Sequence, residues 1–311
     1  MISCTEFIPC YSELFSFLDK KYGYNEVENF WSYLFEPTGD GIPLINYLNK
    51  EGLKGCWSYW AGTLNEEAAD FEMYFNEKRG YFHIKMNRCP SKGKLLQLEN
   101  EIGLKPYPHY CLHCNYYKDS VEKLGYKYIY NFVGTDEAAC SILIYDPEVF
   151  DGRVIVDNET LIMKRNASEN EYFHPDFHSS MNMGIEYLGS KYGDDEVVEF
   201  LQGYTKAVYN KVIKKIKQNG LVEIKKHIEQ CYKNEKASDA IQIDYTDDRI
   251  NVNVKYCPVV KYLLSTGREV SDWYNFTTTV VMQTLCDVIG YSFELHSYDK
   301  ETGASKYTIK K

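Results

Sequence analysis

Two spacings of apolar residues alternate along the second half of the chain, and each predicts a different kind of element. From Asp195 to Gln218, apolar side chains recur every three or four residues, which is typical of one long amphipathic helix with a single buried face. Gly220 ends this pattern, and a second helical pattern follows it in residues 221–231. The spacing then changes to two in the segments 240–245 and 250–256, which predicts an antiparallel hairpin around a polar turn.

The first half of the chain shows the same succession of spacings. Alternating segments at 71–76 and 81–87 predict a hairpin, and Cys89-Pro90 follows it, because proline suits the first turn of a helix. Two prolines then forbid helix, so the next helix is expected to open at 109–111 and to run to Leu124. The strands expected to close the two halves are 127–133, 140–145, 291–297 and 304–309.

The correspondence extends to residue identity, so the chain is predicted to contain two copies of one domain. The offset is 170 residues between Gly23 and Gly193 and 165 residues between Gly125 and Gly290, a drift that small loop deletions would produce. We therefore expect an α+β fold of two tandem homologous domains, each with helices packed on an antiparallel sheet. Further pairs in the same order are Gly52 and Gly220, Glu67 and Glu235, Ala69 and Ala237, and Cys89 and Cys257.

The repeat sets the expected domain boundaries. The first, cysteine-rich repeat covers residues 1–147, and the second covers 174–311. The segment 148–173 belongs to neither copy and is expected to form a linker with its own hairpin, built from Val154–Val156 and Leu161–Met163.

Composition narrows the class of protein. A chain of 311 residues suits two domains of roughly 150 residues each. The net charge of -10 and the lack of a clustered basic stretch argue against a nucleic-acid partner. No apolar run reaches the ~18 residues of a membrane span, so we expect a soluble cytoplasmic protein in which the 10 cysteines are reduced thiols. Tyrosine is unusually common, at 29 residues.

The two predicted repeats differ in their cysteines. The first repeat contains Cys89, Cys111, Cys114 and Cys140, whereas the aligned positions of the second are Cys257, Phe276, Thr279 and Ser305. A Cys-x-x-Cys pair with two distant cysteines is the ligand count of a structural zinc or an iron–sulfur site.

The same residues also fit nucleophilic catalysis. A thiol in the first turn of a helix has a lowered pKa, and His109 or His113 could serve as the base for Cys111 or Cys114. Free cysteine is also a common core residue, so a packing role stays open.

The second repeat opens with a segment that holds two imidazoles and an acid. His174, Asp176 and His178 could bind a divalent metal or transfer protons, or they could simply cap the turn into the next helix. The first repeat lacks both imidazoles, because its aligned residues include Cys4 and Ile8.

The segments "VKYCPVVKYLLSTG", "MNRCPSKGKL", "YCLHC" and "LGYKYIYNFVGTDEAACSILI" resemble the L-2-amino-thiazoline-4-carboxylic acid hydrolase-like family. That family places a Cys-Pro step after a strand, a second cysteine after a short loop and a third at the start of the final strand. Cys89, Cys111 or Cys114, and Cys140 fit these places, whereas the second repeat is a degenerate copy that keeps only Cys257. The resemblance implies hydrolysis of a C–N bond in a small cyclic amidine or amide.

The leading hypothesis is therefore a cytoplasmic hydrolase-like enzyme acting on a small polar molecule. Its site would combine the first-repeat cysteines and His113 with the acid–base groups of the second-repeat entry in a composite site between the domains. One alternative is a protein that binds or senses a small ligand without turnover. Another is a structural zinc or iron–sulfur protein, and in each case the chain could assemble as an oligomer.

Overall fold

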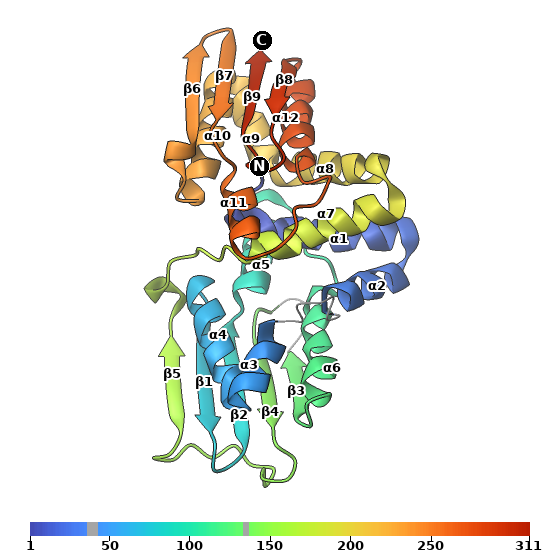
Figure 1. The fold of residues 1–311 in the computed structure, drawn as a ribbon. Coiled ribbons are helices and arrows are strands. Elements are labelled where there is room, and N and C mark those ends of the chain that lie inside the picture. Colours follow the sequence, from blue (N-terminus) through green and yellow to red (C-terminus); the bar gives the residue numbers. More distant parts are fainter. Residues whose placement is uncertain (36–42, 133–136) are drawn as a thin grey trace. The chain divides into compact units, whose positions relative to one another are not determined.

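The computed structural model describes residues 1–35, 43–132 and 137–311, which divide into two compact units (Figure 1). We call Leu18–His174 the N-unit, and Met1–Phe17 together with Pro175–Lys311 the C-unit. The first 17 residues therefore pack in the C-unit, although the sequence pattern places them in the repeat 1–147. Units defined by packing thus differ from repeats defined by sequence at the N-terminus, and the repeat boundaries stay a prediction.

The N-unit has a five-stranded antiparallel sheet in the order β3-β4-β2-β1-β5. Alternate side chains of the central hairpin, such as Phe71, Met73 and Phe82, are buried under the helices, and Trp60 stacks on Phe82 at 5.5 Å between ring centroids. Its strands are β1 (Asp70–Asn76), β2 (Tyr81–Arg88), β3 (Lys127–Phe132), β4 (Cys140–Tyr145) and β5 (Leu161–Arg165). Its helices are α2 (Tyr24–Phe35), α3 (Pro43–Glu51), α4 (Lys54–Glu66), α5 (Pro90–Ile102), the 3-10 helices η2 (Tyr110–Tyr116) and η3 (Ala167–Glu169), and α6 (Tyr117–Glu122).

The C-unit has a four-stranded antiparallel sheet in the order β6-β7-β9-β8, with α10 and α12 against one face (Figure 1). Its strands are β6 (Ile241–Thr246), β7 (Arg249–Val254), β8 (Ser292–Tyr298) and β9 (Ser305–Lys310). Its helices are η1 (Cys4–Glu6), the first part of α1 (Phe7–Tyr22), α7 (Phe177–Tyr192), α8 (Asp194–Val208), α9 (Asn210–Asn219), α10 (Leu221–Asn234), η4 (Ser238–Ala240), α11 (Pro258–Ser265) and α12 (Phe276–Ile289).

The expected α+β class, with helices on antiparallel sheets, is confirmed. The two sheets also share a strand order, because β1-β2-β4-β3 in the N-unit corresponds to β6-β7-β9-β8 in the C-unit. Helices α4 and α10 end in the same way, since the residues that follow Glu67 and Glu235, Ala68 and Lys236, both have φ 54°. Common ancestry of the two halves stays a prediction from the sequence.

Three expected elements differ from the structure. The prediction of an extra hairpin at 148–173 is wrong. Residues 154–156 form no strand, and β5 instead pairs with β1 as the fifth strand of the N-unit sheet. The long helix 195–218 is two helices, α8 and α9, which meet at Tyr209. The helix expected from 109–111 begins as the 3-10 helix η2 and becomes α-helical only at Tyr117.

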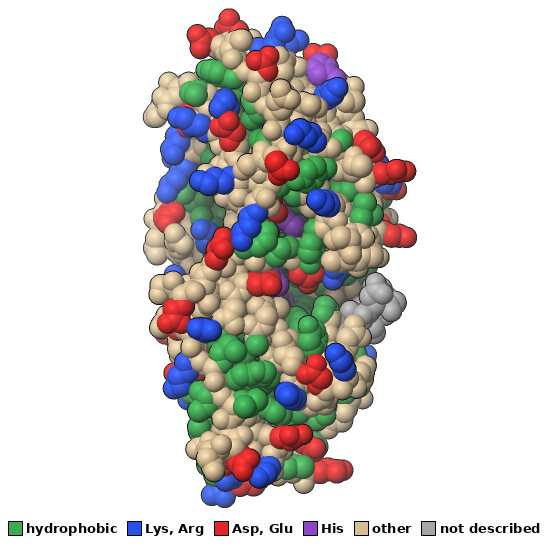
Figure 2. Space-filling model, turned by 60° about the vertical axis from the view of Figure 1, so that its left-hand side comes forward, with side chains coloured by type: hydrophobic (Ala, Val, Ile, Leu, Met, Phe, Trp, Pro, Cys, Tyr) green, Lys and Arg blue, Asp and Glu red, His purple; other side chains and the backbone are tan. Residues whose placement is uncertain are grey.

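No helix in the described part of the chain is both long and apolar enough to cross a bilayer. On the face drawn in Figure 2, Lys and Arg side chains are interspersed with Asp and Glu.

Candidate functional site

The four first-repeat cysteines gather at one end of the N-unit sheet. Cys89 lies between β2 and α5, Cys140 opens the neighbouring strand β4, and Cys111 and Cys114 lie on η2. We call these four residues the cysteine cluster. All four are half-buried free thiols, whereas the other six cysteines of the chain are buried. The cluster is therefore where thiols combine mutual proximity with partial access.

Burial controls the acidity of these thiols. It raises the pKa of Cys111 to about 11 and the pKa values of Cys89 and Cys114 to about 12, and the neighbouring thiols add to the increase at Cys89. A lowered pKa at a helix start was expected, but η2 is a seven-residue 3-10 helix and desolvation outweighs any dipole effect. At neutral pH these thiols are protonated.

Cys114 has an imidazole beside it. Its Sγ lies 3.7 Å from Nε2 of His113, and the other ring nitrogen, Nδ1, is hydrogen-bonded to the carbonyl of Tyr110. A carbonyl only accepts, so Nδ1 carries the proton and Nε2 presents its lone pair towards the thiol. Burial lowers the pKa of His113 to about 4, so the pair is a neutral thiol and a neutral base. This is the geometry for general-base activation of a thiol.

The peptide around Cys114 is anchored to the sheet. The hydroxyl of Tyr128 on β3 donates to the carbonyl of Cys114 at 2.7 Å. His109, the other candidate base, is exposed and packs edge-on against Tyr24 at 5.2 Å between ring centroids.

Glu67 adds a buried carboxyl to this region. It follows α4, its side chain is 14% exposed, and burial raises its pKa to about 7. Its charge raises the pKa of Cys114. An acid that titrates near neutrality beside a thiol and an imidazole is suited to acid–base chemistry. The sequence offered one clue to it, since the predicted repeat pairs Glu67 with Glu235.

The second-repeat entry is divided between the units. His174 ends the N-unit, where Nδ1 is 2.6 Å from Oε2 of Glu66 and Nε2 is 4.0 Å from Oε1 of Glu67. Asp176 belongs to the C-unit and pairs with Arg268 at 3.0 Å, and although it stands at the N-cap of α7 its side chain makes no capping bond to the backbone. His174 and Asp176 therefore contact different partners, each within its own unit.

His178 completes a second cluster, which lies inside the C-unit. Its Nε2 is 2.8 Å from Oε2 of Glu235, and the backbone N–H of Cys4 donates to Oε1 of the same carboxylate at 2.6 Å. Burial alone would raise the pKa of Glu235, but the hydrogen bonds and charge of His178 and the contacts of Cys4 hold it below its usual value. In the described ranges, Cys4, His178 and Glu235 form the group whose potential ligand atoms lie within 4.8 Å of one another.

The cysteine cluster is not among such groups. Within the described residues, no three of its thiols come within that spacing, so the four-cysteine zinc or iron–sulfur site stays a prediction from the ligand count. Cys4, Glu67 and Glu235 belong to no catalytic or metal-binding motif in the sequence. Their importance depends on which chain ends and helix ends meet, and local patterns do not contain that information.

The C-unit counterpart of the cysteine cluster is nearly closed. Cys257, Thr279 and Ser305 line a cavity of about 10 Å³, which is close to the space of one water molecule. Cys257 is buried, and burial raises its pKa. The positions that the sequence pairs with the cysteine cluster hold one thiol in place of four, and the space beside them is almost closed.

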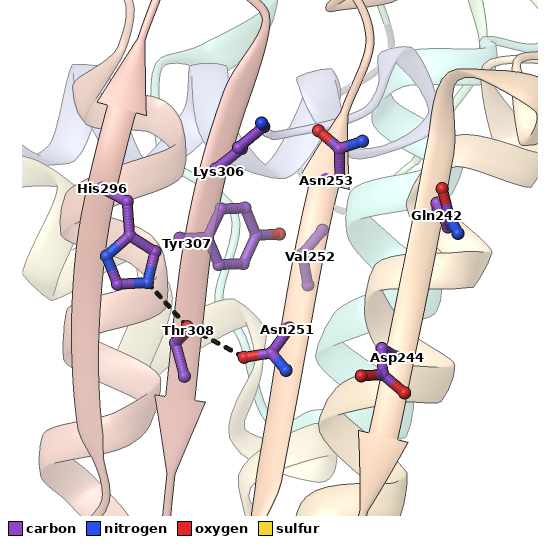
Figure 3. A pocket seen from close by; sticks show the side chains of 9 residues that line it. All are labelled: Gln242, Asp244, Asn251, Val252, Asn253, His296, Lys306, Tyr307 and Thr308. Atoms are coloured by element: carbon purple, nitrogen blue, oxygen red, sulfur yellow. Dashed lines mark hydrogen bonds between the residues drawn. The ribbon is translucent and has the colours of Figure 1, made fainter.

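A more open hollow of about 430 Å³ lies on the outer face of the C-unit sheet (Figure 3). There His296, Thr308 and Asn251 form a hydrogen-bonded row across three strands, with separations of 2.7 and 3.0 Å. Asp244 and Lys306 add both signs of charge. The face could hydrogen-bond a polar molecule, but it contains no thiol.

Comparisons with protein families, with curated proteins and with solved structures find no match to this chain.

Proposed function

We propose that this chain is a thiol-dependent hydrolase that cleaves a C–N bond of a small polar molecule, with Cys114 as the nucleophile and His113 as its base. The observation that carries the proposal is the contact of 3.7 Å between the Cys114 thiol and the imidazole of His113, whose ring is oriented by the Tyr110 carbonyl. The resemblance to the hydrolase-like family supports a cyclic amidine or amide as substrate. The 10 free thiols are consistent with a reducing cytoplasm.

The proposed reaction has two steps. In the first, Sγ of Cys114 bonds to the amide or amidine carbon while His113 takes the thiol proton and passes it to the leaving nitrogen, so the C–N bond breaks. In the second, His113 takes a proton from water, the hydroxyl adds to the same carbon, and the C–S bond breaks as the thiol recovers its proton. The net change is the consumption of one water molecule.

Glu67 has a supporting role in this scheme. His113 is neutral in the resting site and becomes cationic during proton transfer, and an ionised carboxylate nearby stabilises that cation. Because the pKa of Glu67 is about 7, a substantial fraction of it is ionised at neutral pH.

The test is a panel of small cyclic amidines and amides, including L-2-amino-thiazoline-4-carboxylic acid, incubated with the full chain and followed by mass spectrometry. Turnover should add one water molecule to a substrate and should fall to the uncatalysed rate in Cys114→Ser. The matched control is Cys286→Ser, which removes a buried thiol of α12 in the C-unit and should retain turnover. Equal turnover by Cys114→Ser would exclude this nucleophile, and tight binding without any product would favour the ligand-binding alternative.

A further inference from the structure

We propose that the C-unit binds one Zn²⁺ ion through the Cys4 thiolate, a ring nitrogen of His178 and the Glu235 carboxylate. This site is separate from the cysteine cluster and does not depend on the proposed hydrolase. Its starting observation is the convergence of three chemically different ligand atoms within 4.8 Å in the interior of the unit.

Three helix ends meet to form this site. Cys4 opens η1 just before α1, His178 lies in the first turn of α7, and Glu235 follows the last turn of α10. The starts of α1 and α7 are held together by Phe7 and Phe177, whose rings stack at 4.3 Å between centroids. The ligands are therefore positioned by packing that exists without an ion, as a preformed metal site requires.

The site is deeply buried. The exposed fraction of the residue is 0% for Cys4, 1% for His178 and 7% for Glu235. A thiol, an imidazole and a carboxyl group therefore face one another with almost no access to solvent. A buried charge is costly unless it is paired, and a divalent cation that also replaces the thiol proton would offset it.

The orientation of His178 shows which of its nitrogens can serve the ion. Nε2 faces Oε2 of Glu235 at 2.8 Å, whereas Nδ1 is buried and has no hydrogen-bond partner in the described structure. The two ring nitrogens point in divergent directions, so an ion shared with Glu235 must bind Nε2, and Nδ1 then carries the ring proton.

The mixed donor set selects the ion. Sulfur, imidazole nitrogen and carboxylate oxygen are the three ligand types of Zn²⁺, whereas Ca²⁺ and Mg²⁺ take oxygen ligands. Around one zinc such atoms stand roughly 3.3–3.8 Å apart. A pair at the 4.8 Å limit would therefore contract by about 1.0–1.5 Å, and the 2.8 Å contact of His178 with Glu235 would open by about 0.5 Å. Glu67, the N-unit glutamate at the matching place, belongs to no such group of three ligands. His174 is 4.0 Å from it, and no third ligand group lies at such spacing in the described ranges.

The expected consequence is structural. An ion at this position ties the N-terminal segment to α7 and α10, so its binding energy contributes to folding of the C-unit. The test begins with full-length protein prepared without added metal and then exposed to excess Zn²⁺ and desalted. Elemental analysis should find about one zinc per chain, and a strong chelator should lower the melting temperature.

Substitutions locate the ion. Cys4→Ser, His178→Gln and Glu235→Gln should each lower zinc content at least about tenfold, whereas Cys10→Ser, in the same buried N-terminal segment, and Cys114→Ser should retain it. Circular dichroism identifies variants that fail to fold. For those, Co²⁺ substitution of the unaltered protein provides the second readout, because a sulfur-to-cobalt charge-transfer band of one-thiolate intensity requires a single cysteine ligand.

Folded wild-type protein that takes up no zinc, or a chelator that leaves the melting temperature unchanged, would overturn the proposal. Zinc lost in Cys114→Ser but kept in Cys4→Ser, or a cobalt band of several thiolates, would instead assign the metal to the cysteine cluster. None of these outcomes bears on whether Cys114 supports hydrolysis.

Discussion

At the scale of single residues, Glu67 and Glu235 occupy similar places in the two units but differ in acidity. Each follows the helix before the first hairpin, yet burial raises the pKa of Glu67 to about 7 while the partners of Glu235 hold its pKa below the usual value. The difference lies in contact distance, because His178 is 2.8 Å from Glu235 whereas His174 is 4.0 Å from Glu67. Close hydrogen bonds to the charged form outweigh desolvation, and distant charges do not.

Glu67 should make stability depend on pH. The folded protein holds a proton that the unfolded chain releases, so the free energy of unfolding should decrease as pH rises from about 4.5 to about 7. At ~1.4 kcal/mol per pKa unit, Glu67→Gln should be more stable than wild type at alkaline pH by up to about 3 kcal/mol, and this gain should vanish in acid. Urea unfolding across that range measures it. Glu77→Gln, at the exposed β1–β2 turn, is the control, and parallel curves for wild type and Glu67→Gln would contradict the assigned pKa.

Cysteine reactivity gives a second test at this scale. Cys111 is half-buried with a pKa of about 11, whereas Cys286 is fully buried with a pKa raised to about 12. Iodoacetamide should therefore modify Cys111 well before Cys286, by about tenfold or more in rate, and peptide mass mapping would show the order. Both should react equally in urea. Modification of Cys286 first in the folded protein would mean that the cluster is less accessible than described.

At the scale of elements, the ends of α4 and α10 place these glutamates. Ala69 N–H bonds to the Leu64 carbonyl and Ala237 N–H to the Tyr232 carbonyl, which closes each helix around a residue with positive φ. Ala68 and Lys236 occupy a conformation that costs a non-glycine residue ~1–2 kcal/mol. The turn thus stores strain directly beside a buried carboxyl.

Ala68→Gly should relieve part of that strain. Glycine gains at positive φ but loses more chain entropy on folding, so we expect a net stabilisation of up to about 1 kcal/mol. Ala61→Gly, in the middle of the same helix, should instead destabilise by about 1 kcal/mol. Thermal unfolding of both variants measures the contrast, and a destabilised Ala68→Gly would refute the strain.

The sequence predicts elements well where a period is long and unbroken. Both hairpins, β1–β2 and β6–β7, lie within about two residues of the expected segments, because alternating burial leaves few other arrangements. It fails at 154–156, where an alternating segment forms no strand, and at η2, where a 3-10 helix that bonds to β3 through the Cys114 carbonyl replaces the expected α-helix. Pairing partners and helix type are decided by contacts that a local pattern does not contain.

At the scale of the whole molecule, the packing of residues 1–17 gives the predicted first repeat and the N-unit different boundaries. Ile2, Cys4 and Phe15 are fully buried, and all belong to the C-unit. Repeat order alone would have put them with residues 18–147. The candidate sites differ in the same way in how far the sequence predicts them. The cysteine cluster could be predicted from four spaced thiols, whereas the Cys4–Glu235 contact joins residues 231 apart in the chain.

Phe7→Ala tests this division. Removing a buried ring that stacks on Phe177 should cost about 3–5 kcal/mol, and hydrogen exchange should lose protection in residues 175–311 rather than in the hairpin β1–β2. Trp60→Ala, in the core of the N-unit, should show the reverse pattern. Loss of protection confined to β1–β2 in Phe7→Ala would contradict the assignment of the N-terminal segment.

The most direct test of the proposed hydrolase is detection of its covalent intermediate. A substrate found in the panel, quenched in acid during turnover, should leave a transient adduct on the peptide that contains Cys114, and Cys114→Ser should neither form the adduct nor release product. Product formation at the wild-type rate by Cys114→Ser, with no adduct on any thiol of the cysteine cluster, would contradict the account.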